Sequence, residues 1–278
     1  MSPHPVARYV PLLIAGDERG LRDLFVGAPR VNDPRLGWVD DTRFSEFVLN
    51  SHRGLLERHA SVEHAAITAT TSGATEECVL TLVRSGSAAV LPVAVAGDTS
   101  PDDLLVSIRI YHSMWPLLGV HLVRRPILPR VRPLALPDVI GRYHDCLARG
   151  DLSGILEQFA PQGEVREAGS LTALHRGSEA LRRFFALLFE NGGGIALEQC
   201  AIRDTGSTCA LEYVITAWGR SPLPPQAAAC VFERSDAGLL AAVRMYDDVS
   251  VPPRLADIPS DDFLPVGRLE APPAAQWS

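Results

Sequence analysis

The chain has 278 residues, which is long for one compact domain and suits two domains that each bury a core. Hydrophobic residues make up 46% and charged residues 21%, a balance typical of soluble globular proteins and unlike that of disordered or fibrous chains. The formal net charge of −7 argues against a nucleic-acid partner, because nonspecific affinity for a phosphate backbone needs a basic surface.

Three further features exclude other classes of protein. The five cysteines are scattered without metal-ligand spacing, so we expect reduced, mostly buried thiols and no metal site. Neither a glycine-rich phosphate loop nor a nucleophile elbow occurs, so no cofactor is expected. The N-terminus has no apolar signal core, and no apolar run could cross a bilayer. We therefore expect a cytoplasmic protein without a membrane partner.

The sequence repeats itself along most of its length. Arg8, Tyr9, Gly16, Asp17 and Phe25 recur at one offset, as Arg142, Tyr143, Gly150, Asp151 and Phe159. With one further residue of shift, a second set recurs: Glu63, Ile67, Glu77, Leu104, Leu105, Arg109 and Tyr111 match Glu198, Ile202, Glu212, Leu239, Leu240, Arg244 and Tyr246. Chance would not hold this register, so we predict two copies of one domain.

Proline-rich segments separate the parts of the chain. The run RRPILPRVRPLALP favours an extended spacer, because its prolines are incompatible with helix interior. We predict a first domain over 5–124, a linker over 125–137, a second domain over 138–251 and a Pro-rich tail over 252–278.

Helices open the second domain. Val139, Tyr143 and Leu147 lie four residues apart on one face of a predicted helix, and Gly150 ends that helix. Asp151 caps a second helix, which is expected to carry Phe159 inward. Pro161 and Gly163 then turn the chain into a short strand, and a third helix is predicted over 178–190.

The remainder of the domain alternates as a β-sheet does. Strands are predicted near 197–203, 209–218, 227–234 and 240–249. Three helices against a curved antiparallel sheet make an α+β domain. A sheet that is apolar on both faces needs a partner outside, so we expect the two domains to pack sheet to sheet as an intramolecular pseudo-dimer.

Several motifs resemble the nuclear transport factor 2-like superfamily, which includes the ketosteroid isomerases and the SnoaL-like polyketide cyclases. They are RYHDCLARGDLSGILEQF, HRGSEALRRFF and VRMYDDV in the second half, and RYVPLLIAGDERGLRDLF, VNDP and SIRIYHS in the first. The resemblance implies two tandem cone-shaped α+β domains. In the first domain, Pro11 falls within the expected opening helix, which should be kinked or start late.

The resemblance also implies candidate catalytic residues. The Tyr-to-carboxylate spacing of the isomerases leads from Tyr9 to Asp33 and from Tyr143 to Glu167. A carboxylate can move a proton beside a carbonyl while a phenol hydrogen-bonds the developing enolate oxygen. The isomerases add a protonated Asp on a later strand, where this chain has residues near Val95 and Cys230, which argues against a steroid isomerase in the strict sense.

The last strand of each copy supplies another candidate. SnoaL-like cyclases carry an acid directly after an aromatic residue, as Asp247 follows Tyr246, and the first copy has His112 at this place. Strand alternation puts Asp247 on the same face as Met245, so both should point into the pocket of the second domain. We expect Phe184, Trp218 and Met245 to contact substrate there.

Structural roles compete with each of these assignments. Tyr9 and Tyr143 could be core tyrosines, and Asp33 a turn residue before proline. Glu167 could be a solvated acid, Asp247 the partner of a nearby arginine, and His112 a satisfied core residue.

Two functions follow from these patterns. The first is a cofactor-independent isomerase, cyclase or dehydratase acting on a small apolar carbonyl compound, such as a polyketide or terpenoid. The second is a non-catalytic pair of domains that binds an apolar ligand or fills its pockets with side chains. An open apolar cavity beside Asp247 would favour the enzyme.

Overall fold

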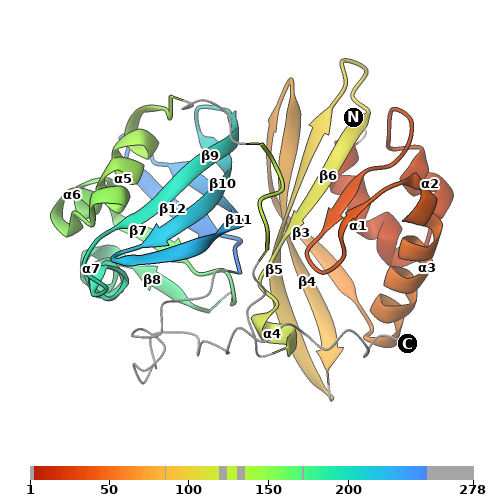
Figure 1. Cartoon of the computed structure of the whole chain (residues 1–278), viewed down its shortest axis with the longest axis horizontal. Helices are drawn as coiled ribbons and strands as arrows, with labels where there is room; N and C mark the ends of the chain where they lie inside the picture. Colours follow the sequence, from red (N-terminus) through yellow and green to blue (C-terminus); the bar gives the residue numbers. More distant parts are fainter. Residues whose placement is uncertain (1–2, 85, 119–123, 130–134, 171, 249–278) are drawn as a thin grey trace.

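A computed structural model describes residues 3–84, 86–118, 124–129, 135–170 and 172–248 of the chain. It contains two six-stranded sheets that face each other across the centre of the molecule (Figure 1). Helices cover the outer side of each sheet, so each half has its own core between sheet and helices. The predicted tail over 252–278 lies outside the described residues.

The first half begins with helices and ends with long strands. Its helices are α1 (Pro5–Ala15), α2 (Glu18–Arg22), α3 (Asp41–Glu57) and the short α4 (Trp115–Leu118). Its strands are β1 (Val31–Asp33), β2 (Gly37–Val39), β3 (Ser61–Thr70), β4 (Gly73–Arg84), β5 (Ser87–Thr99) and β6 (Leu105–Tyr111).

The second half follows the same plan. Its helices are α5 (Asp138–Arg149), α6 (Leu152–Glu157) and α7 (Gly177–Phe189). Its strands are β7 (Phe159–Arg166), β8 (Leu174–Arg176), β9 (Ile195–Asp204), β10 (Thr208–Trp218), β11 (Ser221–Arg234) and β12 (Leu240–Met245). The structure therefore confirms the α+β class and the two copies.

The two sheets share one strand order and one register. The orders are β2-β1-β6-β5-β4-β3 and β8-β7-β12-β11-β10-β9. Val31 pairs with Ile108 in the first sheet, and the residues at the equivalent positions, Val165 and Val243, pair in the second. Both of these pairings are parallel, so the prediction of a purely antiparallel sheet was wrong: each sheet is mixed.

Glycines and aspartates set the ends of the first helices in both copies. Gly16 and Gly150 close α1 and α5 in the left-handed conformation, with φ of 69° and 66°. Asp17 and Asp151 then cap the next helix, each through a side-chain oxygen that accepts a backbone N–H. Pro11 lies inside α1, which nonetheless begins at Pro5, so the expectation of a late start was wrong.

Two other local predictions need correction. Phe159, expected on a helix, is the first residue of β7, because α6 ends at Glu157. Pro161 and Gly163 lie within that same strand and do not precede it. The strand tolerates both residues because its pairing with β12 shifts register in this region.

Successive side chains of the central strands point to opposite faces of each sheet. Leu211, Tyr213 and Phe232 point to the helices and join the core of the second half. Their neighbours Ala210 and Val231 point the other way, toward the first half. A third apolar cluster forms there between the sheets, from Ala94, Ala96, Tyr111, Ala210, Ala227, Ala229, Val231 and Tyr246.

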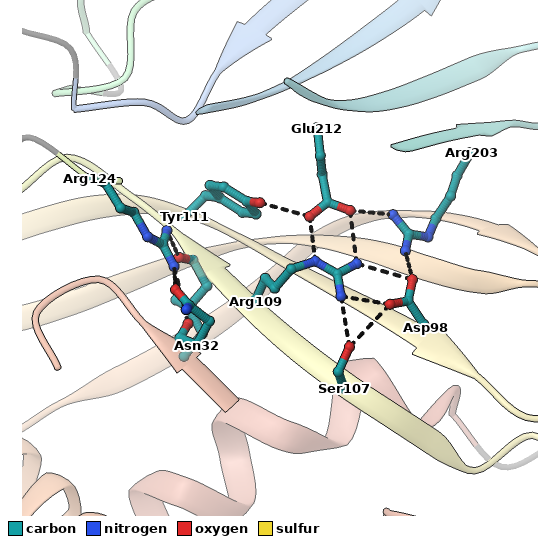
Figure 2. Close-up of polar contacts among 9 residues, drawn as sticks. Asn32, Asp98, Ser107, Arg109, Tyr111, Arg124, Arg203 and Glu212 are labelled. Atoms are coloured by element: carbon teal, nitrogen blue, oxygen red, sulfur yellow. Dashed lines mark hydrogen bonds and ion pairs between the residues drawn. The ribbon is translucent and has the colours of Figure 1, made fainter. Parts of the chain in front are cut away.

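Buried ion pairs connect the two sheets, and Figure 2 shows the one between Arg109 and Glu212. Arg109 of β6 donates two hydrogen bonds to Glu212 of β10, at 2.6 and 2.9 Å. Arg244 of β12 donates two to Glu77 of β4, also at 2.6 and 2.9 Å. These residues are repeat equivalents, so the contacts are reciprocal, as in an interface with twofold symmetry.

Tyrosine hydroxyls complete each ion pair. Tyr111 donates to Glu212 at 2.7 Å, and its equivalent Tyr246 donates to Glu77 at 2.6 Å. Glu212 also accepts from Arg203 at 2.9 Å, and Asp98 accepts from both Arg109 and Arg203 (Figure 2). Three of the residue pairs that revealed the repeat in the sequence thus hold the two copies together: Glu77 and Glu212, Arg109 and Arg244, and Tyr111 and Tyr246.

Burial opposes ionisation of Glu212, but the charges and hydrogen bonds of Arg109 and Arg203 outweigh it. Together they lower the pKa of Glu212 to about 2. A depressed carboxyl pKa stabilises the folded state above the ordinary value of 4.5, and this stability is lost as the pH falls from there toward 2.

We expect Glu212→Gln to lower the free energy of unfolding by about 3–5 kcal/mol, because it leaves two buried arginines to share the partly exposed Asp98. Glu77→Gln is the matched variant. It should cost less, about 1–3 kcal/mol, because Arg244 is more exposed and keeps Glu233 as a partner.

Urea denaturation of the full chain at neutral pH measures both values. Equal losses in the two variants would contradict the asymmetry. Repeating the measurement between pH 4.5 and 2 should show a smaller further loss in Glu212→Gln than in the wild type.

Candidate functional site

The second half encloses a cavity of about 110 Å³ between its sheet and its helices. All six residues predicted for this domain line it: Tyr143, Glu167, Phe184, Trp218, Met245 and Asp247. An engineered apolar cavity of about 150 Å³ binds benzene, so a ligand the size of a single ring matches this space. The cavity is open beside Asp247 and is not packed shut by Phe184, Trp218 and Met245.

Tyr143 reaches the cavity from the buried face of α5. Its ring packs edge-on against Phe159, Phe185 and Phe232, with centroids 5.6 to 6.2 Å apart. Burial raises the pKa of Tyr143 well above its ordinary value, with smaller contributions from nearby groups that include Asp247. The phenol therefore keeps its proton and can donate it in a hydrogen bond.

Glu167 lies directly after β7, at the cavity wall. Its Oε1 is 2.7 Å from Nε2 of His175 on β8, and both side chains are only 15% exposed. His175 stacks on the ring of Phe184 at 4.4 Å. The imidazole therefore holds the carboxylate in place, a role for His175 that the sequence pattern did not indicate.

Asp247 lies two residues beyond the end of β12 and lines the cavity beside Met245, as the alternation predicted. It is anchored on both sides by contacts with the first domain. Tyr246 donates to Glu77, and Asp248 accepts from the Ser113 hydroxyl at 2.7 Å. Domain one thus fixes the segment that carries this acid.

Trp218 forms a rigid part of the apolar wall. Its indole Nε1 donates to the carbonyl of Leu188 at 2.6 Å, and its side chain is buried. The polar atom of the ring is therefore satisfied by α7, which leaves the apolar surface of Trp218 for the cavity.

His144 is a cavity residue that the sequence interpretation missed. It is 7% exposed, and neither of its ring nitrogens has a hydrogen-bond partner among the residues that the structure describes. Burial lowers the pKa of His144 from 6.5 to about 4. The only sequence signal for a buried His144 was its position directly after Tyr143, on a helix where Ile140 as well as Val139 faces the core.

The equivalent residues of the first domain occupy a different environment. Tyr9 is fully buried, and within the described part of the chain its hydroxyl has no hydrogen-bond partner. Asp33 accepts the backbone N–H groups of Arg35 and Leu36 at 2.8 and 3.0 Å, which is the arrangement of a turn residue. His112 lines a pocket of only about 10 Å³, room for a single water.

The cysteines and possible metal ligands add no further chemistry. Cys78, Cys146, Cys200, Cys209 and Cys230 are free and buried, as expected. Cys230 lines the cavity, and burial raises its pKa well above the ordinary value, so the thiol stays neutral. Among the described residues, no cluster of His, Cys, Asp and Glu could hold a metal ion.

The sequence profile of the SnoaL-like domain matches residues 140–243, which contain the core of the second half and most of the cavity wall. The second half therefore matches a SnoaL-like domain. The first half has the same strand order and register, so the chain contains two tandem copies of this fold.

Solved structures similar to the chain are each about one domain long. A candidate polyketide cyclase from Sinorhizobium meliloti is 24% identical and covers 40% of this chain and 94% of its own, with a TM-score of 0.34. A Mycobacterium tuberculosis protein in complex with estradiol-17β-hemisuccinate is 15% identical and covers 39% and 89%, with a TM-score of 0.34.

A third neighbour is SalBIII, an epoxide hydrolase/cyclase-like enzyme with a role in pyran ring formation in the polyether salinomycin. It is 18% identical and covers 39% of this chain and 86% of its own, with a TM-score of 0.33. No curated protein shows a significant match to the sequence. Within the described residues, no helix has the length and apolar character needed to span a membrane.

The buried His144 predicts a pH dependence of stability. The unfolded chain binds a proton at this residue near pH 6.5, and the folded chain does so only near pH 4. Stability is therefore present above pH 6.5 and is lost as the pH falls toward 4. We expect the wild type to lose about 2–3 kcal/mol more than His144→Val between pH 7 and 4.5.

Urea denaturation at the two pH values measures this difference. Because other groups titrate in the same range in both proteins, only the difference between the two losses is informative. Parallel losses in wild type and variant would show that His144 is not buried as a neutral ring.

Proposed function

We propose that the second domain is a cofactor-independent acid/base enzyme that isomerises, cyclises or dehydrates a small apolar carbonyl compound. One observation carries this proposal: a phenol and two carboxyl groups, Tyr143, Glu167 and Asp247, line one otherwise apolar cavity. They come from a helix, from the end of β7 and from the end of β12. Their convergence supplies a hydrogen-bond donor and two groups that can carry a proton.

Each residue has a proposed role. Tyr143 donates a hydrogen bond to the carbonyl oxygen and stabilises the negative charge that develops there. One carboxylate, Glu167 or Asp247, removes the proton from the carbon beside the carbonyl and returns it elsewhere on the molecule. With two carboxyl groups at one cavity, one can give a proton while the other takes one.

The apolar wall determines the class of substrate. Phe184, Trp218 and Met245 contact the carbon skeleton, and the volume of about 110 Å³ fits one ring or a short chain. A polyketide or terpenoid carbonyl compound has this character. Domain one serves mainly as a partner that completes an intramolecular pseudo-dimer, with the domains at 5–124 and 138–251, joined by the linker at 125–137.

The competing function is a binding domain without catalysis. The same cavity would then hold an apolar molecule, and the carboxyl groups would only orient it. His112 lines only a small pocket of about 10 Å³ that it shares with residues of the second domain, which fits a non-catalytic role for the first copy.

Deuterium exchange into cyclohexanone tests the proposal without knowledge of the natural substrate. Removal of a proton beside the carbonyl is the first step of the proposed mechanism, and this ring suits the cavity. In D₂O, followed by ¹H NMR, the wild type should accelerate exchange above the buffer rate. Of Asp247→Asn and Glu167→Gln, the variant that removes the base should lower the enzymatic rate at least 100-fold. Tyr143→Phe should lower it by about 10–100-fold.

Glu179→Gln is the matched control, because it removes an acid of the same domain that is 87% exposed on α7. Its exchange rate should equal that of the wild type. Binding of cyclohexanone without accelerated exchange would reject the enzyme and leave the binding domain.

A further inference from the structure

His144 has unused hydrogen-bonding capacity at the cavity wall. A neutral imidazole carries one N–H donor and one acceptor nitrogen, and neither finds a partner here. The rings of Tyr143, Phe232 and Tyr213 surround it, with centroids 5.4, 5.5 and 6.5 Å away. Leaving a buried polar group unpaired costs folding free energy, so such a group calls for an explanation.

The fold does not require a polar residue at this position. The offset that relates Tyr9 to Tyr143 relates Val10 to His144, and Val10 packs in the core of the first domain at 8% exposure. A valine at position 144 would therefore pack at this position of the helix without leaving two buried nitrogens unpaired. The histidine occurs in the copy that has the ligand-sized cavity.

The rings in contact with His144 carry no charge. The titratable side chains in ring contact with it are Tyr143 and Tyr213, and burial raises the pKa of each well above its ordinary value. The low pKa of His144 itself follows from burial alone. A neutral imidazole suits a neutral oxygen, whereas a carboxylate ligand would favour its protonation.

We propose that His144 hydrogen-bonds a hydroxyl or carbonyl oxygen of a ring-sized ligand in this cavity, and so selects oxygenated molecules over hydrocarbons of the same shape. The proposal rests on the cavity named under the proposed function but needs no catalysis. The χ2 torsion of histidine is broad, so a small rotation can turn either nitrogen toward the ligand. His144 thus determines specificity, beside the groups that move the proton.

Phenol and toluene test this selectivity, because they share one shape and differ in a hydroxyl against a methyl group. We expect the full-length wild type to bind phenol about tenfold more tightly than toluene, measured by NMR titration. His144→Val, which copies the first domain, and His144→Phe, which keeps the ring volume, should lose this preference and retain toluene binding.

Tyr143→Phe is the control, because the tyrosine hydroxyl could also bind phenol. A preference that survives in both His144 variants, or that is absent from the wild type, overturns the proposal. Equal affinities in the wild type would mean that the imidazole is satisfied by water or not at all.

A second measurement does not depend on the variants folding. In protein labelled with ¹⁵N-histidine, phenol should shift the ring nitrogen resonances of His144 and toluene should not. Identical responses to the two probes would contradict the hydrogen bond. Failure of cyclohexanone exchange with an intact phenol preference would reject the enzyme alone, and the reverse result would reject only the role of His144.

Discussion

The structure depends on the two buried arginine–glutamate pairs between the sheets. Arg109 and Glu212 are almost completely removed from water, which is costly for both charges unless each is paired and hydrogen-bonded. The pairing requires that the facing sides of the two sheets are apolar enough to exclude water. The two sheets must also lie close enough together for the charged side chains to be in contact. Small residues such as Ala94 and Ala229 provide that close approach. Neither sheet could present this face to solvent without exposing apolar surface and losing the partners of its charges, so each domain needs the other.

This interface and the cavity share one strand. Along β12 and just beyond it, Arg244 and Tyr246 point to the interface, whereas Met245 and Asp247 point to the cavity. Strand alternation therefore transmits the position of domain one directly to the proposed acid. The bond from Ser113 to Asp248 adds a second anchor. Domain one can in this way contribute to the site of its neighbour, as the partner subunit does in many dimers.

Much of this arrangement could be predicted from sequence. Helix and strand periodicity are local patterns, and the repeat is visible when the sequence is compared with itself. Tyr143 and Asp247 were placed correctly by helix and strand periodicity. The repeat identified Glu77 and Glu212, although not that each pairs with the arginine of the other copy, because reciprocity is a property of how two surfaces meet. The parallel pairing of β1 with β6 was missed for a related reason: it joins segments far apart in the chain. His144 was missed because a lone histidine on an apolar helix face is usually a satisfied core residue, and only the structure shows that its nitrogens have no partners.

A comparison of the two copies separates the residues that the fold requires from those that line the cavity of the second domain. At equivalent positions the first domain has Val10, Asp33 and His112, and the second has His144, Glu167 and Asp247. Asp33 forms a turn through its backbone partners, whereas Glu167 is held at the cavity wall by His175. The tyrosine is common to both copies and buried in both, so a phenol at this place is compatible with a purely structural role. Burial keeps that phenol protonated, and it becomes a useful donor only where a cavity and a carboxylate lie beside it. The chemical difference between the copies therefore comes from the few residues that surround an otherwise shared tyrosine.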